Sequence, residues 1–299
     1  MKEGWKTHAI GRHLVDLPGD ARTSESYRIN RDEIELLSAS DTSRLAVLVG
    51  ERELLLRQTI RSVRREPMFI ERIQHPNDAV TIVTWASEHS DALYHFDTYF
   101  KAGSRALRYS GDVSLDKKSS ILSFLGQLAG EWREIPPKVP PQGVGFIAGE
   151  VILVDQRFNL ESWRMAIHLA GKPDVSFKVT AYTQRSVEPG LRKRGGGVLA
   201  GLLSTVAGFT QLRNRERPVG PIEADEILVA GTQDGKRSYG FKWEAPGKAD
   251  SLAEPNLNVS LQVGESAYLT NKESFASDEE ALELWDAVVG SLRLRPGAV

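Results

Sequence analysis

Apolar and polar residues alternate with a period of two over much of the first half of this chain, which is typical of β-strands. Tyr94, Phe96, Thr98 and Phe100, for example, fall on one face of an extended segment. By the same pattern we expect strands over residues 8–16, 25–30, 33–39, 80–85, 93–102 and 105–110. Between these strands the apolar spacing becomes helical. One helix is predicted after Asp41 as its N-cap and before Pro67, and a closing helix from Ser114 to Trp132.

The second half repeats this order. Strands are predicted over residues 145–154, 163–169, 175–181, 239–243 and 257–263, with a further one around 227–229. The dipeptide Asp234-Gly235 suits the positive φ angles of a type I′ turn and predicts a hairpin. A helix is expected between Pro189 and Arg213. A closing helix that carries Trp285 follows the capping box formed by Ser277 and Glu280.

A proline-rich segment separates the two halves. Residues 136–142 contain four prolines, which favour an extended polyproline II conformation and a stiff spacer. We therefore predict an N-terminal domain over residues 1–135, a Pro-rich hinge over 136–142 and a C-terminal domain over 143–299. The fold class expected is α+β, with two similar domains, each a mainly antiparallel sheet with two packed helices.

The composition excludes several classes of protein. The 299 residues include 38 basic and 40 acidic side chains, a formal net charge of -2, so no basic footprint for nucleic acid is expected. There is no cysteine, which rules out disulfides and thiolate chemistry. The longest helix-like apolar stretch, residues 198–209, is too short for a membrane span, which needs about 20 residues. We expect no integral membrane segment in this chain.

Several motifs resemble catalytic or cofactor sites but lack the partner residues or the spacing that such sites need. Ser114 and Lys117 fit Ser-x-x-Lys, but the partner motifs of penicillin-binding enzymes are missing, so Ser114 is interpreted as a helix cap. The glycines over residues 143–149 miss the spacing of a dinucleotide fingerprint and enter a strand. None of the six histidines forms a zinc-binding pair. We therefore predict no catalytic residues, no metal site and no cofactor.

One segment is unusual, because three basic residues, Arg192, Lys193 and Arg194, precede three glycines. Such a loop could cradle a phosphate at a helix N-terminus, although the closing Gly-Lys-Ser/Thr of a Walker loop is missing. It could instead be a plain connection to a buried helix, which we favour. A third interpretation is a loop that contacts a partner protein.

Three stretches of the chain resemble a known family. They are residues 4–18, which begin Gly-Trp-Lys-Thr-His, residues 221–226 together with 240–244, and residues 277–282. In these stretches the chain resembles the periplasmic immunity proteins that neutralise class-four phospholipase effectors of type VI secretion systems. The resemblance implies a non-enzymatic protein whose two domains hold a cognate lipase effector, with the mobile lid of the lipase clamped shut. As contact points we predict the loop with Arg192, Lys193 and Arg194 and the turn with Gln233, Asp234 and Lys236.

Two alternatives remain open. Duplicated α+β domains also occur in cytoplasmic chaperones that load secreted effectors, and an encoded signal peptide upstream of Met1 would distinguish an immunity protein from a chaperone. The first residues contain no apolar signal core, so we expect a periplasmic location after signal removal, or a cytoplasmic one if Met1 is the native start. The second alternative is an enzyme that uses the scattered carboxylates Asp155, Glu161 and Glu223, but their spacing matches no known catalytic set.

Overall fold

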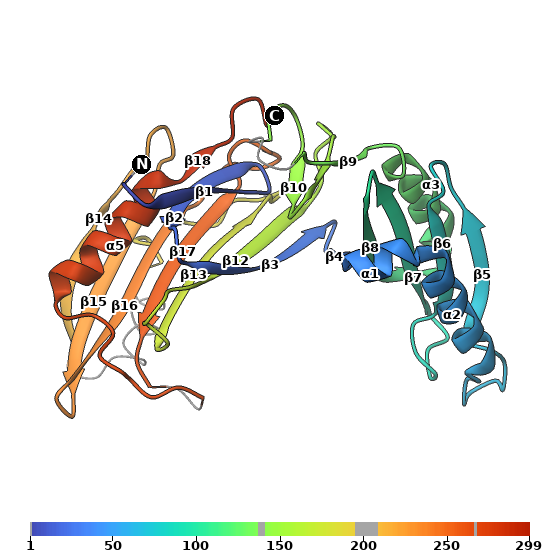
Figure 1. Cartoon of the computed structure of the whole chain (residues 1–299), viewed down its shortest axis with the longest axis horizontal. Helices are drawn as coiled ribbons and strands as arrows, with labels where there is room; N and C mark the ends of the chain where they lie inside the picture. Colours follow the sequence, from blue (N-terminus) through green and yellow to red (C-terminus); the bar gives the residue numbers. More distant parts are fainter. Residues whose placement is uncertain (1, 137–140, 195–208, 266–267) are drawn as a thin grey trace. The chain divides into compact units, whose positions relative to one another are not determined.

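The computed structural model describes residues 2–136, 141–194, 209–265 and 268–299, and the chain forms two compact units (Figure 1). Unit 1 consists of Met1–Glu25 and Arg157–Val299, and unit 2 of Ser26–Gln156. This division differs from the predicted one at residues 136–142. Residues 1–25 belong with the C-terminal part of the chain, and residues up to 156 belong with unit 2. Within the predicted hinge, residues 137–140 lie outside the described residues.

Strand pairing explains both differences. In unit 1, β1 (Trp5–Ile10) and β2 (His13–Pro18) form an antiparallel hairpin, and β2 also pairs with β18 (Arg293–Leu294) near the end of the chain. In unit 2, β10 (Phe146–Ala148) pairs with β11 (Val151–Leu153), which pairs with β9 (Trp132–Glu134). Pairing across such long sequence separations is not visible in the local pattern of the chain.

The main sheet of unit 1 has the order β14-β15-β16-β17-β13-β12, and its neighbouring strands are antiparallel. Its strands are β12 (Glu161–His168), β13 (Val175–Tyr182), β14 (Phe209–Glu216), β15 (Asp225–Gln233), β16 (Lys236–Ala245) and β17 (Asn256–Val263). Helix α5 (Asp278–Ser291) covers one face of this sheet (Figure 1). The Trp285 ring of α5 lies 6.0 Å from Phe177 of β13 and 5.5 Å from Phe241 of β16, between ring centroids.

The main sheet of unit 2 has the order β4-β8-β7-β6-β5, also antiparallel. Its strands are β4 (Asp32–Leu36), β5 (Phe69–Gln74), β6 (Val80–Trp85), β7 (Leu93–Ala102) and β8 (Arg105–Ser114). Strand β3 (Arg22–Ile29) begins in unit 1 and continues into unit 2, where it pairs with β4. The helices of this unit are α1 (Ala39–Ser43), α2 (Leu45–Gln58), the short 3₁₀ helix η1 (Leu115–Lys117) and α3 (Lys118–Leu128).

Side chains of β7 point alternately to the two faces of the unit 2 sheet, and both faces are packed. Tyr99 belongs to the core cluster beneath α2, which also contains Ile82 and Leu56. On the other face, Phe100 contacts Tyr109, which in turn lies against Phe124 of α3. The observed fold is therefore α+β and rich in antiparallel sheet, as the sequence predicts.

Several predicted elements are corrected by the structure. Residues 8–16 and 145–154 are each a hairpin rather than one strand, because Gly11 and Gly149 adopt positive φ angles and reverse the chain. The closing helix of unit 2 ends at Leu128, and Trp132 lies in β9. Strand β5 was not predicted. Its first residues, Phe69-Ile70, are both apolar and do not alternate, and a β-bulge lies there.

Two predicted helices also change. The N-cap of α1 is Ser38, whose hydroxyl accepts a hydrogen bond from the Asp41 backbone N–H, so Asp41 lies one turn inside. In the predicted helix from Pro189 to Arg213, residues 195–208 lie outside the described residues, and residues 209–213 belong to β14. The capping of α5 is confirmed, since the Ser277 hydroxyl accepts from the Glu280 N–H at 3.3 Å.

Candidate functional site

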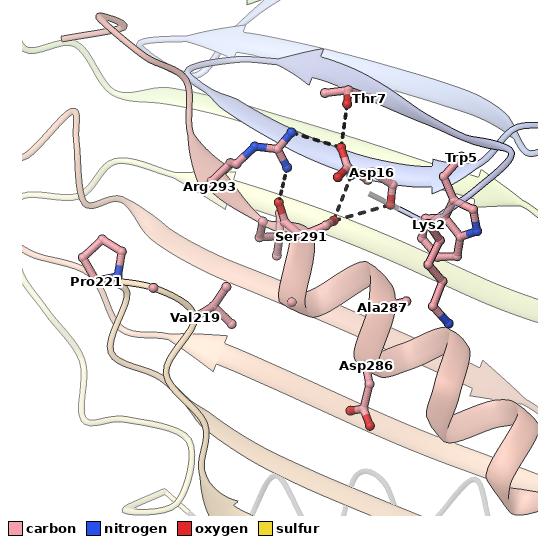
Figure 2. Close-up of a pocket in the computed structure, with 13 residues that line it drawn as sticks. Lys2, Trp5, Thr7, Asp16, Val219, Pro221, Asp286, Ala287, Ser291 and Arg293 are labelled. Atoms are coloured by element: carbon pink, nitrogen blue, oxygen red, sulfur yellow. Dashed lines mark hydrogen bonds and ion pairs between the residues drawn. The ribbon is translucent and has the colours of Figure 1, made fainter.

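A groove of about 800 Å³ opens on unit 1 between the β1–β2 hairpin, the C-terminal turns of α5 and the turn Val219–Pro221 (Figure 2). Three segments far apart in the sequence therefore form one concave surface. The residues that line it come from these segments and from the chain ends: Lys2, Trp5, Thr7, Asp16, Val219, Gly220, Pro221, Asp286, Ala287, Gly290, Ser291, Leu292 and Arg293.

The polar groups on one wall of the groove are already paired. Asp16 accepts hydrogen bonds from the Thr7 hydroxyl at 2.7 Å and from the Arg293 guanidinium at 3.1 Å (Figure 2). The Asp16 backbone N–H donates to the Ser291 hydroxyl at 2.8 Å. These bonds hold the hairpin against α5, so the groove offers a fixed shape and apolar contact rather than reactive groups.

The floor of the groove on α5 is made of small residues. A β-carbon placed on Gly290 would meet no atom within 4 Å, so the space above it is open. Ala287 lies on the same side, one turn earlier. Small side chains allow the backbone of a bound segment to approach the helix closely.

An ion-pair network fixes α5 to the edge of the unit 1 sheet. The carboxylate of Glu226 on β15 is fully buried and accepts a hydrogen bond from the Trp285 indole N–H at 2.8 Å. It is also paired with Arg215 at 3.1 Å, with Arg213 at 3.6 Å and with Arg217. Buried carboxylates persist only with such partners, so this cluster is structural.

The network continues to Asp286, which borders the groove. Arg213 donates two hydrogen bonds to its carboxylate, at 2.7 and 3.0 Å, and Arg217 lies 2.9 Å from it. Burial raises the pKa of this carboxyl, but the hydrogen bond from Arg213 and the nearby guanidinium charges outweigh it and hold the pKa below its ordinary value. Asp286 is therefore ionised at neutral pH.

A second buried cluster joins the two ends of the chain. Arg12, in the turn of the β1–β2 hairpin, donates two hydrogen bonds to Glu161, at 2.8 and 2.7 Å, and one to the Ala298 carbonyl at 2.5 Å. Next to it His13 is buried, and neither of its ring nitrogens has a hydrogen-bond partner among the residues that the structure describes. Burial, and then the positive charges of Arg12 and Arg295, lower the pKa of His13 to about 4. The imidazole is neutral at physiological pH.

The structure gives the predicted basic loop a structural role. The Arg192 guanidinium lies 3.1 Å from Glu216, and the Arg192 N–H donates to Asp225 at 3.1 Å. Arg194 pairs with the buried Glu244 and donates to the Pro189 carbonyl at 2.7 Å. Lys193 is exposed, and among the described residues its side chain forms no ion pair. Two of the three cations therefore hold the loop on the sheet.

The predicted turn lies at the other end of the same hairpin. Gln233 pairs with Lys236 across the turn, whereas Asp225 pairs with Glu244 at the far end of β15. Asp234 has φ 53°, as the type I′ turn requires. Lys236 lies 3.6 Å from Glu265. Eight residues at about 3.3 Å each separate the two ends by roughly 27 Å, so the structure does not bring the predicted loop and turn together.

Sequence reasoning missed an exposed apolar surface on unit 2. Five large apolar side chains on or just after α2 are 49–57% exposed. We call them the α2 surface: Val47, Leu54, Leu55, Ile60 and Val63. Their spacing carries a signal, because the consecutive leucines 54–56 span about 200° of a helix at about 100° per residue, and one buried face cannot take all three.

A titratable cluster on β7 and β8 of the same unit is also internally paired. His95 lies 2.7 Å from Asp112 and 3.4 Å from Asp97. The hydrogen bond to Asp97 is the main reason why the pKa of His95 lies above its ordinary value. Among the described residues no group of three or more metal-ligating side chains converges, and no helix there has the length and apolar character of a membrane span.

Comparisons with known proteins identify the family of this chain. A family model described as the C-terminal domain of Tle cognate immunity protein 4 matches residues 140–297. The apo structure of the immunity protein TplEi of the T6SS from Pseudomonas aeruginosa is 35% identical to this chain, with 99% of each chain covered and a TM-score of 0.89. This chain belongs to the Tle cognate immunity protein 4 family.

Two further solved structures support the assignment. A chain of the Tle4–Tli4 complex is 34% identical, with 100% of both chains covered and a TM-score of 0.90. TplEi complexed with an "L" peptide is 34% identical, covers 99% of this chain and 100% of that chain, and has a TM-score of 0.85. No curated protein sequence matches. The family's C-terminal model begins before β10 and β11, which belong to unit 2, so sequence family and compact unit have different boundaries.

Proposed function

We propose that this protein is an immunity protein that binds and inhibits a cognate phospholipase effector of a type VI secretion system. The observation that carries the proposal is its likeness over 99–100% of the chain to immunity proteins at 34–35% identity, one of them solved in the Tle4–Tli4 complex. A likeness over the whole length includes both compact units. The proposed activity is therefore one in which both units take part.

The protein acts by binding rather than by catalysis. Of the three carboxylates considered for an enzyme, Glu161 is committed to Arg12, and Asp155 belongs to a different unit. Glu223 is exposed on the segment before β15. Two serine–histidine hydrogen bonds occur among the described residues, Ser24–His168 and Ser62–His89, but both are exposed and neither involves one of these three carboxylates, which favours an inhibitor.

The inhibitor holds the lid region of the phospholipase in its closed state. A ligand shifts such an equilibrium only by its differential affinity for the two states, so the interface must fit the closed effector better than the open one. A mole-for-mole blocker of a toxin also needs a Kd on the order of nanomolar, which corresponds to about 12 kcal/mol. The protein acts in the periplasm, where the phospholipase reaches its lipids.

A short segment of the effector occupies the groove on unit 1. The relative solved with the "L" peptide supports recognition of a short segment by this family. The groove has an open floor at Gly290 and paired polar walls. In Gly290→Leu the β-carbon meets no atom within 4 Å, the rest of the side chain projects into the groove, and helix propensity improves. We expect it to weaken effector binding by about tenfold or more and to leave the melting temperature equal or higher. Unchanged affinity would remove the groove from the interface.

The loop and the turn remain proposed contact points. Lys193 and Lys236 are the two side chains to test: among the described residues Lys193 is exposed and forms no ion pair, and Lys236 pairs only with the exposed Glu265, whereas Arg194 pairs with a buried carboxylate. Charge reversal of Lys193 or Lys236 should mainly slow association and reduce its salt dependence, as expected of charges at the rim of an interface. Association rates of both variants equal to those of the wild type would exclude the two lysines.

A cellular experiment tests the function itself. The neighbouring phospholipase gene is expressed with a periplasmic signal, and this protein is co-expressed either in the periplasm or in the cytoplasm. We expect growth to be rescued only by the periplasmic form. Rescue by neither form would contradict the immunity function, and a complex that forms while the phospholipase stays active would favour a chaperone.

A further inference from the structure

Helix α2 is apolar on two sides. Its inner side carries Leu45, Val49 and Leu56, which are buried in the core cluster of unit 2 with Ile82 and Tyr99. Its outer side carries the α2 surface, where five large apolar side chains are about half exposed. Single exposed apolar residues are ordinary, but a group of them on one helix and the loop after it marks an interaction site.

A cavity of about 320 Å³ adjoins this surface. Leu55 lies at its edge, and Leu56, Met68, Thr84 and Trp85 line it. It is large enough to receive an apolar side chain from outside. A pocket beside an exposed apolar helix face is the usual setting of the residues that dominate a protein interface.

The wall of this cavity is held rigidly. The Arg61 guanidinium lies 3.8 Å from the centre of the Trp85 ring. Arg61 is fully buried and pairs with Glu66 and with Asp91, the latter at 2.6 Å. Because Trp85 is fixed before any partner arrives, binding loses little conformational entropy at this point.

Two arginines in the segment after α2 border the surface. The segment 57–66 contains four arginines, of which Arg57 pairs with Glu53 and the buried Arg61 pairs with Glu66 and Asp91. Arg64 is exposed and lies 3.5 Å from Asp91. Arg65 is also exposed, and among the described residues it forms no ion pair. A partner that covers the apolar residues would gain by presenting a carboxylate to Arg64 and Arg65.

We propose that the α2 surface docks an amphipathic helix of the effector, with one apolar side chain in the cavity and a carboxylate against Arg64 and Arg65. This inference rests on the proposed function and adds the surface and the chemistry of the partner segment. Exposed carboxylates also lie at this site, Glu51 on the helix and Glu88 at the cavity. They would be repelled by an anionic lipid surface, which is why a protein helix fits better than a membrane.

The test uses the full-length protein and the phospholipase encoded beside its gene. Leu55→Asp places a charge at the edge of the cavity, and Leu54→Asp places one on the outer face, 57% exposed. The matched control is Leu115→Asp in η1, which is 42% exposed and precedes α3 on the other face of the sheet. We expect Leu55→Asp to raise the Kd by about 100-fold, as for the centre of an interface, and the control to change it by less than threefold.

The outcomes separate the possibilities. Normal circular dichroism with lost affinity supports the proposal, and if Leu55→Asp does not fold, Leu54→Asp gives the answer. Wild-type affinity in a folded Leu54→Asp or Leu55→Asp variant overturns it. Binding of the wild type to phosphatidylglycerol vesicles, abolished by these substitutions while effector affinity stays normal, overturns it in favour of a membrane contact. If the wild type itself does not bind the phospholipase, the proposed function fails first.

Discussion

Replacing Glu226 with alanine should be among the most damaging single changes in unit 1. The carboxylate is fully buried and holds the Trp285 indole N–H at 2.8 Å. It also balances the guanidinium groups of three arginines on and just after β14, of which Arg213 and Arg217 are shared with Asp286. The variant leaves a buried N–H without an acceptor and concentrates positive charge around α5.

The structure sets the size of this effect. Removing one partner of a buried ion pair costs about 3–5 kcal/mol. Arg213 and Arg217 keep Asp286, and Arg215 is 52% exposed and can turn to water, so the lower end, about 3 kcal/mol, is expected. For a unit of this size, about 2–4 °C is lost per kcal/mol, which gives a drop of about 6–12 °C in melting temperature.

A matched glutamate serves as the control. Glu216 also pairs with an arginine, Arg192 at 3.1 Å, but it is 82% exposed. Surface ion pairs contribute about 0–1 kcal/mol, so Glu216→Ala should shift the transition by less than about 4 °C. Urea and thermal unfolding, followed by near-ultraviolet circular dichroism, measure both variants. Equal shifts for Glu226→Ala and Glu216→Ala would refute the reasoning, because the assigned cost then does not depend on burial.

Three further predictions concern stability. The folded-state pKa of His13 is about 4, below its unfolded value of 6.5, so the unfolded state binds the proton first. The free energy of unfolding therefore falls by about 3 kcal/mol as the pH drops from about 6.5 to 4. His13→Phe should remove this part of the pH dependence of urea unfolding, and an unchanged slope would contradict the prediction. Gly11→Ala should destabilise far more than Gly171→Ala, because both have positive φ but only the first places a β-carbon 2.2 Å from an indole ring; equal melting temperatures would be the contrary result. Arg194→Ala should cost about 2 kcal/mol, because the buried Glu244 carboxylate loses one charged hydrogen bond and keeps only Lys242, at 3.4 Å, whereas Lys193→Ala should cost almost nothing; calorimetry showing similar losses would disprove the structural role given to this loop.

Local pattern predicted several strands. Residues 175–181 fall within β13, where buried positions alternate with more exposed ones, and residues 93–102 are a strand in prediction and structure although β7 is packed on both faces. The Asp234-Gly235 turn and the Ser277 cap were also predicted, because their chemistry depends only on nearby residues. These features need no knowledge of distant contacts.

Long-range pairing could not be predicted in this way. The alternation over residues 8–16 continues through Gly11, so the reversal into a hairpin was hidden, and nothing near residue 13 indicates that β18 pairs there. Arg12 and Glu161 are 149 positions apart, and only the folded chain shows that they neutralise each other. The groove and the compact units depend on the same contacts.

The predicted contact residues stay a prediction, because charge in a sequence does not show whether it is already paired. Arg192 and Arg194 have the residue type expected of a contact surface, yet both are held by carboxylates of the sheet. The α2 surface was not predicted, because the apolar spacing in this segment was interpreted only as that of a helix. Its exposure follows from the geometry of the helix and from the limited area that the sheet can cover.

The most direct test of the immunity function is a titration of phospholipase activity. The phospholipase encoded beside this gene is held at a concentration well above the expected nanomolar Kd, and hydrolysis of a phospholipid substrate is followed as the full-length protein is added. The account predicts a linear loss of activity that reaches zero at one protein per phospholipase. Full activity at a severalfold excess of correctly folded protein would contradict it.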